Sequence, residues 1–387
     1  MQSTLAIVGG GPAGMMAAIR AAETLGDGAR VVLFDKNDRL GRKIYLTGKG
    51  RCNLTNRRTW EDFAPHIHPN QRFLQNAFRA FSNEDLIRFF EEELGVPTVT
   101  LQGQRVYPAS LVAGDVARAL ERRVRELGVD VRYGATVHSF AELEDYAAVI
   151  IATGGKSYPV TGSTGDGFRF AEEAGHTVTP LFPSETALLP HAYDSDLPGL
   201  ELKNVGLHLY VDRTLVQSDQ GDFNFTNDGL ESGIAYHLSR RAVWALVNGQ
   251  RVDIVLDLKP ALTEEQLKAR IEREHPSLRA LMPESLIGPF KRAHQGLTEK
   301  SLPSALKSWS FRIDDYKGYD RAVVTAGGVS LKEIVPKTMA SRLRPGLFFC
   351  GEVLDLDGDT GGYNLQIAFS TGALAGVSAA KYMLGCW

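Results

Sequence analysis

The first 35 residues constrain the fold of this chain more than any other stretch. A short apolar run from Leu5 to Val8 indicates a buried strand, and glycines follow it in a G-x-G-x-x-G pattern. The alanine-rich segment behind the glycines favours a helix, and a second apolar run ends at Asp35, about 20 residues after the last glycine. Strand, glycine turn, helix and acid in this order predict a Rossmann-type unit that binds a dinucleotide. The alternative is a glycine-rich turn in an ordinary α/β unit.

Each part of this motif has a physical role at a pyrophosphate. Gly9 permits the tight turn, Gly11 lets the backbone approach the pyrophosphate, and Gly14 lets the helix pack closely on the strand. The free N–H groups at the helix start face the phosphates. Asp35 is placed to accept hydrogen bonds from ribose hydroxyls, which disfavours a 2′-phosphate at this site. The cofactor contacts predicted in this motif are Gly9, Gly11, Pro12, Ala13, Gly14, Asp35 and Lys36.

The composition is that of a globular protein with room for two or three structural units. Of 387 residues, 43% are apolar and 23% are charged, and the net charge of −3 does not by itself indicate a nucleic-acid partner. The N-terminus lacks the basic segment of a signal peptide, and no apolar run is long enough to span a bilayer. Cys52, Cys350 and Cys386 show neither C-x-x-C nor metal-binding spacing. We therefore expect a cytoplasmic protein without disulfides, metal or a membrane-spanning segment.

The stretch after Asp35 is the second informative feature. Its sequence GRKIYLTGKGRCNLTN interleaves glycines, Asn and Thr with basic side chains, which indicates a cationic loop directly after the ribose-binding strand. From the residues alone, a loop along the cofactor and a solvated basic loop are both open. Cys52 follows Arg51 and lies near Lys49 in sequence, so we expect positive neighbours to lower its pKa. The alternative for Cys52 is a small, buried packing residue.

This stretch closely resembles the signature of the YhiN-like flavoproteins, a family that includes aminoacetone oxidase, a bile-acid reductase and the ribosomal-RNA dihydrouridine synthase. The resemblance implies FAD as the cofactor, with the loop beside it and the Arg-Cys-Asn triplet at the isoalloxazine ring. It makes Arg51, Cys52 and Asn53 the catalytic candidates. Because we expect its basic neighbours to make Cys52 more reactive, this residue could act as a general acid that protonates the substrate carbon. The cofactor contacts implied in the loop are Arg42, Lys43, Gly50, Arg51 and Cys52.

Later segments resemble the same family. In GQRVYPAS, Arg105 and Tyr107 are further site candidates, although an exposed turn explains them equally well. Glu352 would bond the ribityl chain, and the last helix would direct its positive end at N1 and O2 of the flavin. The small residues of that helix are also explained by close packing on a neighbour. The cofactor contacts predicted in these segments are Val137, Thr153, Gly154, Gly155, Gly351, Glu352, Gly361, Gly362, Tyr363 and Asn364.

The middle of the chain changes in character. Alternating apolar residues predict a β-rich part, and a helical part follows. The glycines near 165 are not followed by a second nucleotide-binding unit, so NAD(P)H is expected to dock transiently. We predict a FAD-binding domain of residues 1–186 and 325–387, a β-rich inserted domain of residues 187–258 and 307–324, and a helical subdomain of residues 259–306.

Basic residues gather in this helical part. Residues 259–312 contain ten Lys and Arg against six Asp and Glu, which favours a polyanionic partner. By resemblance this partner is ribosomal RNA, contacted by Lys268, Arg270, Lys291 and Arg292 among others. A solvated helical face is the alternative.

The sequence thus predicts an FAD oxidoreductase. NAD(P)H would reduce the flavin, and flavin N5 would deliver hydride to an activated C=C bond, such as that of uridine in ribosomal RNA. One alternative is an FAD-dependent oxidase that takes hydride from a small amine and passes electrons to oxygen. Another is a flavin-bound binding protein without catalysis.

Overall fold

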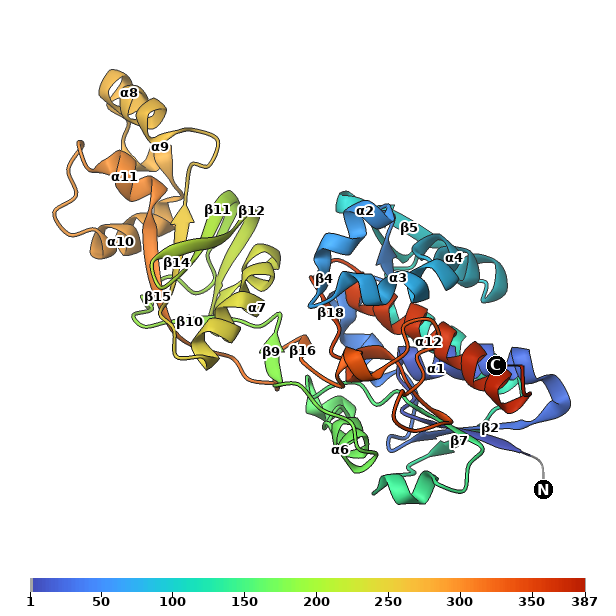
Figure 1. Cartoon of the computed structure of the whole chain (residues 1–387). Coiled ribbons are helices and arrows are strands. Elements are labelled where there is room, and N and C mark those ends of the chain that lie inside the picture. The colour runs from blue at the N-terminus through green and yellow to red at the C-terminus, as the bar shows by residue number, and fades with distance from the viewer. Residues whose placement is uncertain (1–2, 387) are drawn as a thin grey trace. The chain divides into compact units, whose positions relative to one another are not determined.

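A computed structural model describes residues 3–386, and these form two compact units (Figure 1). One unit contains the residues up to Leu181 and those from Val324 onward, and the other is Phe182–Val323. The predicted fold class is confirmed: a Rossmann-type unit is interrupted by β-rich and helical parts. The helices within 259–306 belong to the same unit as the β-rich part, and their separation as a subdomain stays a prediction.

The first unit is built on a parallel sheet in the strand order β17-β8-β1-β2-β7. β1 (Thr4–Val8) lies at its centre, and its residues from Leu5 to Val8 are apolar and buried, as in a strand covered on both faces. β17 (Leu347–Phe349) pairs with β8 (Ala148–Ile151), so segments from both ends of the chain share one sheet. β2 (Arg30–Asp35) and β7 (Asp130–Tyr133) complete the other side.

Helices α1 (Pro12–Leu25) and α12 (Tyr363–Met383) pack against each other in this unit (Figure 1). A Cβ atom added at Gly376 would lie 2.3 Å from the carbonyl oxygen of Ala17, so a glycine is needed for this close approach. The other α-helices and strands of the unit are α2 (Trp60–Phe63), α3 (Gln71–Ala80), α4 (Asn83–Arg88), α5 (Ala113–Glu126), α6 (Asp166–Glu173), β3 (Thr55–Asn56), β4 (Ile67–His68), β5 (Thr98–Leu101), β6 (Arg105–Pro108), β16 (Val324–Ala326) and β18 (Asp357–Gly358).

The second unit contains a closed barrel in the strand order β10-β13-β12-β11-β14-β15. Burial alternates along β15 (Trp309–Tyr316), because every second side chain faces the core. The other elements are β9 (Phe182–Ser184), β10 (Leu188–Pro190), β11 (Glu201–Val211), β12 (Thr214–Thr226), β13 (Gly229–Glu231), α7 (Gly233–Val247), β14 (Val252–Asp257), α8 (Glu264–Glu274), α9 (Leu278–Leu281), α10 (Glu284–Ala293) and α11 (Leu302–Lys307). Among the residues described in either unit, no helix is both long and apolar enough to cross a membrane.

Candidate active site

In the turn after β1, an added side chain would find open space at Gly11 and would clash at Gly9 and Gly14. A Cβ atom added at Gly14 would lie 1.8 Å from the carbonyl oxygen of Gly9, and one added at Gly9 would lie 2.5 Å from that of Ala152. A Cβ atom at Gly11 would meet nothing within 4 Å. Gly11 is the N-cap of α1, Pro12 opens the helix, and no side chain caps the first amides. Open backbone and free N–H groups fit the pyrophosphate of a dinucleotide.

Asp35, at the end of β2, is buried and bonded to the same turn. Its Oδ2 accepts a hydrogen bond of 2.8 Å from the Gly10 amide, and its Oδ1 accepts two from Asn37, one from the backbone and one from the side chain. The Asn37 side chain in turn accepts from Arg42 at 2.9 Å. Asp35 therefore fixes the glycine turn, while its bond to a ribose stays a prediction. Sequence reasoning missed Asn37, which carries no motif.

Three further residues predicted to contact the cofactor, Lys36, Val137 and Gly50, have different surroundings. Lys36 forms an ion pair of 2.6 Å with Asp166 and donates to the Thr164 hydroxyl. Val137 is buried in the segment after β7. Gly50 is exposed, has a φ of 84° and would meet nothing with an added Cβ atom. Their contacts with a cofactor stay predictions.

Lys43 and Glu352 join four segments of the chain that are far apart in sequence. The Lys43 ammonium and the Glu352 carboxylate form an ion pair of 2.9 Å. Glu352 Oε1 also accepts the backbone amide of Thr325 at 2.9 Å, and Thr325 Oγ1 bonds the hydroxyl and the amide of Ser157. A Cβ atom at Gly155 would lie 2.5 Å from Thr325 Oγ1, so the Thr-Gly-Gly turn closes on this network. Thr325 and Ser157 escape sequence reasoning because their role comes only from this contact.

The Thr-Gly-Gly turn also carries a polar atom without a partner. Thr153 Oγ1 is buried and has no hydrogen bond within the described residues. Native proteins seldom leave such a group unpaired, and a bound ligand is one way to complete it. Gly351 is similarly tight, because a Cβ atom there would lie 2.7 Å from the Cβ of Ala13 in α1. These features fit a cofactor held between the turn and the start of α1.

Cys52 is fully buried, and this corrects one expectation. Burial raises the pKa of its thiol to about 12, and a hydrogen bond with Thr47 lowers it by less. The predicted lowering of this pKa by Arg51 and Lys49 is therefore wrong: desolvation of the thiolate outweighs the sequence neighbours. Arg51 is exposed and lies over the Tyr107 ring, with its guanidinium carbon 5.2 Å from the ring centre. The catalytic roles of Cys52 and Arg51 stay predictions.

Asn53 connects the loop to the start of α12. With its amide oriented so that both ends find partners, its nitrogen donates to the carbonyl oxygens of Val106 and Thr55, and its oxygen accepts the Gly362 amide at 3.0 Å. Gly361 and Gly362 both have positive φ, and a Cβ atom at Gly362 would lie 2.5 Å from the Thr55 carbonyl. Asn53 is thus a positioning residue for the helix start, and contact with the flavin stays a prediction for it.

Two histidines share one carboxylate beside this helix start. Asp359 Oδ2 is 2.8 Å from Nδ1 of His66, and its Oδ1 is 3.0 Å from Nε2 of His68. The His66 ring stacks on Tyr363, the first residue of α12, with ring centres 4.5 Å apart. Asn364 bonds both backbone groups of the last residue of β18. The cluster was missed because its members come from segments that only pairing of β4 and β18 brings together.

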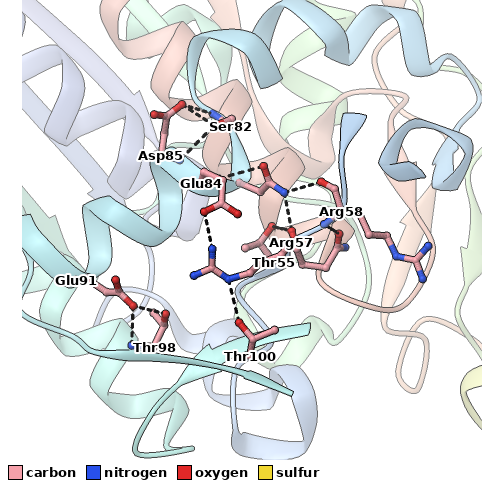
Figure 2. A network of polar contacts seen from close by, with 11 residues as sticks. Thr55, Arg57, Arg58, Ser82, Glu84, Asp85, Glu91, Thr98 and Thr100 are labelled. Carbon is pink, nitrogen blue, oxygen red and sulfur yellow. Dashed lines mark hydrogen bonds and ion pairs between the residues drawn. The ribbon is translucent and has the colours of Figure 1, made fainter. Parts of the chain in front are cut away.

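A polar network fixes the backbone between β3 and α4 (Figure 2). The guanidinium of Arg57 donates to Glu84 at 2.6 Å and to the Thr100 hydroxyl at 3.0 Å. The Asn83 side chain donates to the carbonyl oxygen of Arg58 at 2.8 Å. Figure 2 shows that the Arg58 side chain itself points away from these contacts.

A central parallel sheet, an open glycine turn and strands from both chain ends define a Rossmann-type dinucleotide-binding protein. The sequence matches the profile described as "HI0933-like protein Rossmann domain" over residues 3–378, and the chain belongs to this family. The resemblance to the YhiN-like oxidoreductase flavoenzymes is confirmed, and the chain is accordingly an enzyme of this class.

Curated relatives match over nearly the whole chain. The 3-dehydro-bile acid delta(4,6)-reductase of Clostridium scindens is 30% identical over 97% of this chain and 99% of its own length. The ribosomal RNA dihydrouridine synthase of Haemophilus influenzae is 27% identical over 97% and 98%, and that of Escherichia coli is 28% identical over 94% and 95%.

Among solved structures, a similar fold occurs in a 3-ketosteroid-delta4-(5alpha)-dehydrogenase from Rhodococcus jostii. It is 14% identical with a TM-score of 0.50, and the match covers 98% of this chain and 97% of that one. A 3-ketosteroid delta1-dehydrogenase from Sterolibacterium denitrificans is 12% identical, also with a TM-score of 0.50, over 98% and 99%. These likenesses concern the fold alone.

Proposed function

We propose that this chain binds FAD without a covalent bond and uses NAD(P)H to reduce an activated C=C bond, with uridine in ribosomal RNA as the substrate. The observation that carries the proposal is the open turn at Gly11 beside free amides, next to the unpaired hydroxyl of Thr153. The printed activities of the relatives add support, because a delta(4,6)-reductase and a dihydrouridine synthase both saturate a C=C bond conjugated to a carbonyl.

The chain's own residues would hold the cofactor and handle the proton. The turn at Gly11, the Thr-Gly-Gly turn and the start of α12 are the contacts that fit FAD. Hydride transfer from NAD(P)H to the substrate is the chemistry that FAD supplies when it is bound.

We further propose that His66 and His68 supply the proton. Both bond the carboxylate of Asp359, which orients the two rings, and each has a second ring nitrogen through which a proton can pass: Nε2 of His66 and Nδ1 of His68. Cys52 is the weaker donor because it is fully buried with a thiol pKa of about 12, far from the operating pH.

RNA contact through the helical part is also a proposal, and ion pairs limit which residues can make it. Arg292 pairs with Asp194 at 2.6 Å, and Arg270 pairs with Glu274 at 2.9 Å. Lys291 is exposed and has no carboxylate partner within residues 3–386. Lys291 is therefore the better-placed cation for a phosphate.

Mapping of dihydrouridine in ribosomal RNA from a strain that lacks this protein tests the proposal. We expect a site to revert to uridine and to be restored by the intact gene. Unchanged dihydrouridine at every site, together with NAD(P)H oxidation that RNA does not stimulate, would remove RNA as the substrate.

A further inference from the structure

Three arginines belong to the small sheet β3-β6-β5 and to the chain on either side of β3: Arg51 precedes β3, Arg58 follows it, and Arg105 begins β6. In the pairing of β3 with β6, Asn56 lies opposite Arg105, and the Asn56 side chain accepts the amide of Arg58 at 3.2 Å. Arg105 and Tyr107 are two residues apart on β6, so they share a face of the strand. Arg51 lies over the Tyr107 ring. The ring contact and the strand geometry therefore place Arg51 and Arg105 beside Tyr107, and Arg58 lies two positions after the residue opposite Arg105.

The start of α12 confirms this proximity. A Cβ atom added at Gly361 would lie 3.9 Å from Nε of Arg105. Burial raises the pKa of the Tyr363 hydroxyl to about 12, and the charges of Arg58 and Arg105 lower it by less. Both guanidinium groups are thus near the first residue of the helix. The carboxylates that act on Tyr363 from the same region already have partners, because Asp359 is bonded to two imidazoles and Asp62 to Thr59.

These arginines differ from most others in the chain because they lack acidic partners. Within residues 3–386, no carboxylate forms an ion pair with Arg51, Arg58 or Arg105. Neighbouring Arg57, in contrast, is paired with Glu84 at 2.6 Å (Figure 2). Three positive charges close together repel one another, so an anion that binds among them gains from all three. Guanidinium groups bind phosphate oxygens with two parallel hydrogen bonds.

We propose that Arg51, Arg58 and Arg105 form a site for backbone phosphates of an RNA substrate, those that flank the nucleotide to be reduced. This inference rests on the proposed function and adds a second contact region to that of the helical part.

Salt-dependent binding tests this site. The FAD-loaded R58Q/R105Q protein and the parent would be titrated with a fluorescent, uridine-containing single-stranded RNA from 50 to 200 mM salt. Loss of two phosphate contacts reduces the log–log slope by about 1.4 and weakens binding by about tenfold or more at the lowest salt. The matched control is R292Q, whose guanidinium is already paired with Asp194. The exposed single variant R105Q should lose about 0.7 of slope and serves if the double variant does not fold.

The outcomes separate this site from the function. If the parent binds and reduces RNA while R58Q/R105Q keeps its slope and affinity, the site is wrong and the function stands. If the parent binds no RNA at 50 mM salt, the proposed function fails, and the site fails with it. Titration with NADPH and NADH tests another source of phosphate. If R58Q/R105Q binds NADPH more weakly than the parent does but binds NADH equally well, the arginines bind the 2′-phosphate of NADPH, and the assignment to RNA is overturned.

Discussion

Two glycines of the same turn should respond differently to the same added methyl group: one variant should lose cofactor binding and the other should lose stability. In Gly11→Ala the new Cβ atom enters open space, and the backbone at this position, with φ −75° and ψ −175°, suits any residue. In Gly14→Ala it would lie 1.8 Å from the carbonyl oxygen of Gly9 and 3.3 Å from the Cβ of Ala152. The first variant should lose FAD, and the second should lose stability.

The magnitudes follow from these contacts. At Gly11 the weaker helix cap and the stiffer unfolded chain nearly cancel, so the unfolding free energy of the cofactor-free protein should change by less than about 1 kcal/mol. A methyl group in the space of the pyrophosphate costs about 1–3 kcal/mol, which is about 5- to 150-fold in Kd for FAD. At Gly14 a clash with backbone reaches the upper end of that range, about 3 kcal/mol. The gain of about 1 kcal/mol in helix propensity leaves a net loss of about 2 kcal/mol.

Calorimetric titration of the cofactor-free proteins with FAD gives the first quantity, and their denaturant unfolding gives the second. Gly376→Ala is a control outside the turn, because its Cβ atom would lie 2.3 Å from the Ala17 carbonyl and should destabilise the packing of α1 on α12. A Gly11→Ala protein that binds FAD as tightly as the parent would refute the pyrophosphate assignment.

Four further predictions follow from the site. Acid precipitation should leave FAD in a yellow supernatant, and colour in the pellet would mean a covalent bond. At neutral pH a thiol reagent should modify the exposed Cys386 and spare Cys52, because burial raises the pKa of the Cys52 thiol to about 12. Rapid reaction of a Cys386→Ser protein, with the label found on Cys52, would show that Cys52 is reactive after all. Asp359→Asn removes a carboxylate oxygen that orients both imidazoles, so reduction of the substrate should slow while reduction of the flavin by NAD(P)H keeps the parent rate, and an unchanged rate of substrate reduction would exclude the histidines as donors. Lys291→Gln should weaken RNA binding more than Arg292→Gln, and equal effects would remove the distinction between free and paired cations.

The sequence was sufficient for features that depend on local order. The spacing of Gly9, Gly11 and Gly14 predicted the turn, and each glycine has the space or the close contact that its role requires. The fold class followed from the separation of nucleotide-type turns at the two ends of the chain. These inferences need only neighbours in sequence and the periods of helix and strand.

Features that depend on distant partners could not be obtained in this way. The burial that raises the pKa of Cys52 comes from the packed surroundings, whereas its sequence neighbours indicated the opposite direction. Counting charges in residues 259–312 could not reveal that Arg292 is paired with Asp194, which lies outside that window. The ion pair of Lys43 with Glu352 also joins residues that only the folded sheet brings together.

The central claim is that electrons pass from NAD(P)H through this protein to uridine in RNA. The direct measurement is anaerobic: the FAD-loaded protein is reduced with one equivalent of NADH or NADPH and then mixed with ribosomal RNA that lacks dihydrouridine. We predict that RNA restores the absorbance of the oxidised flavin and that an equal amount of dihydrouridine forms. Flavin that NAD(P)H does not reduce, or that stays reduced after RNA is added and reoxidises only when oxygen is admitted, would contradict the account and favour an oxidase.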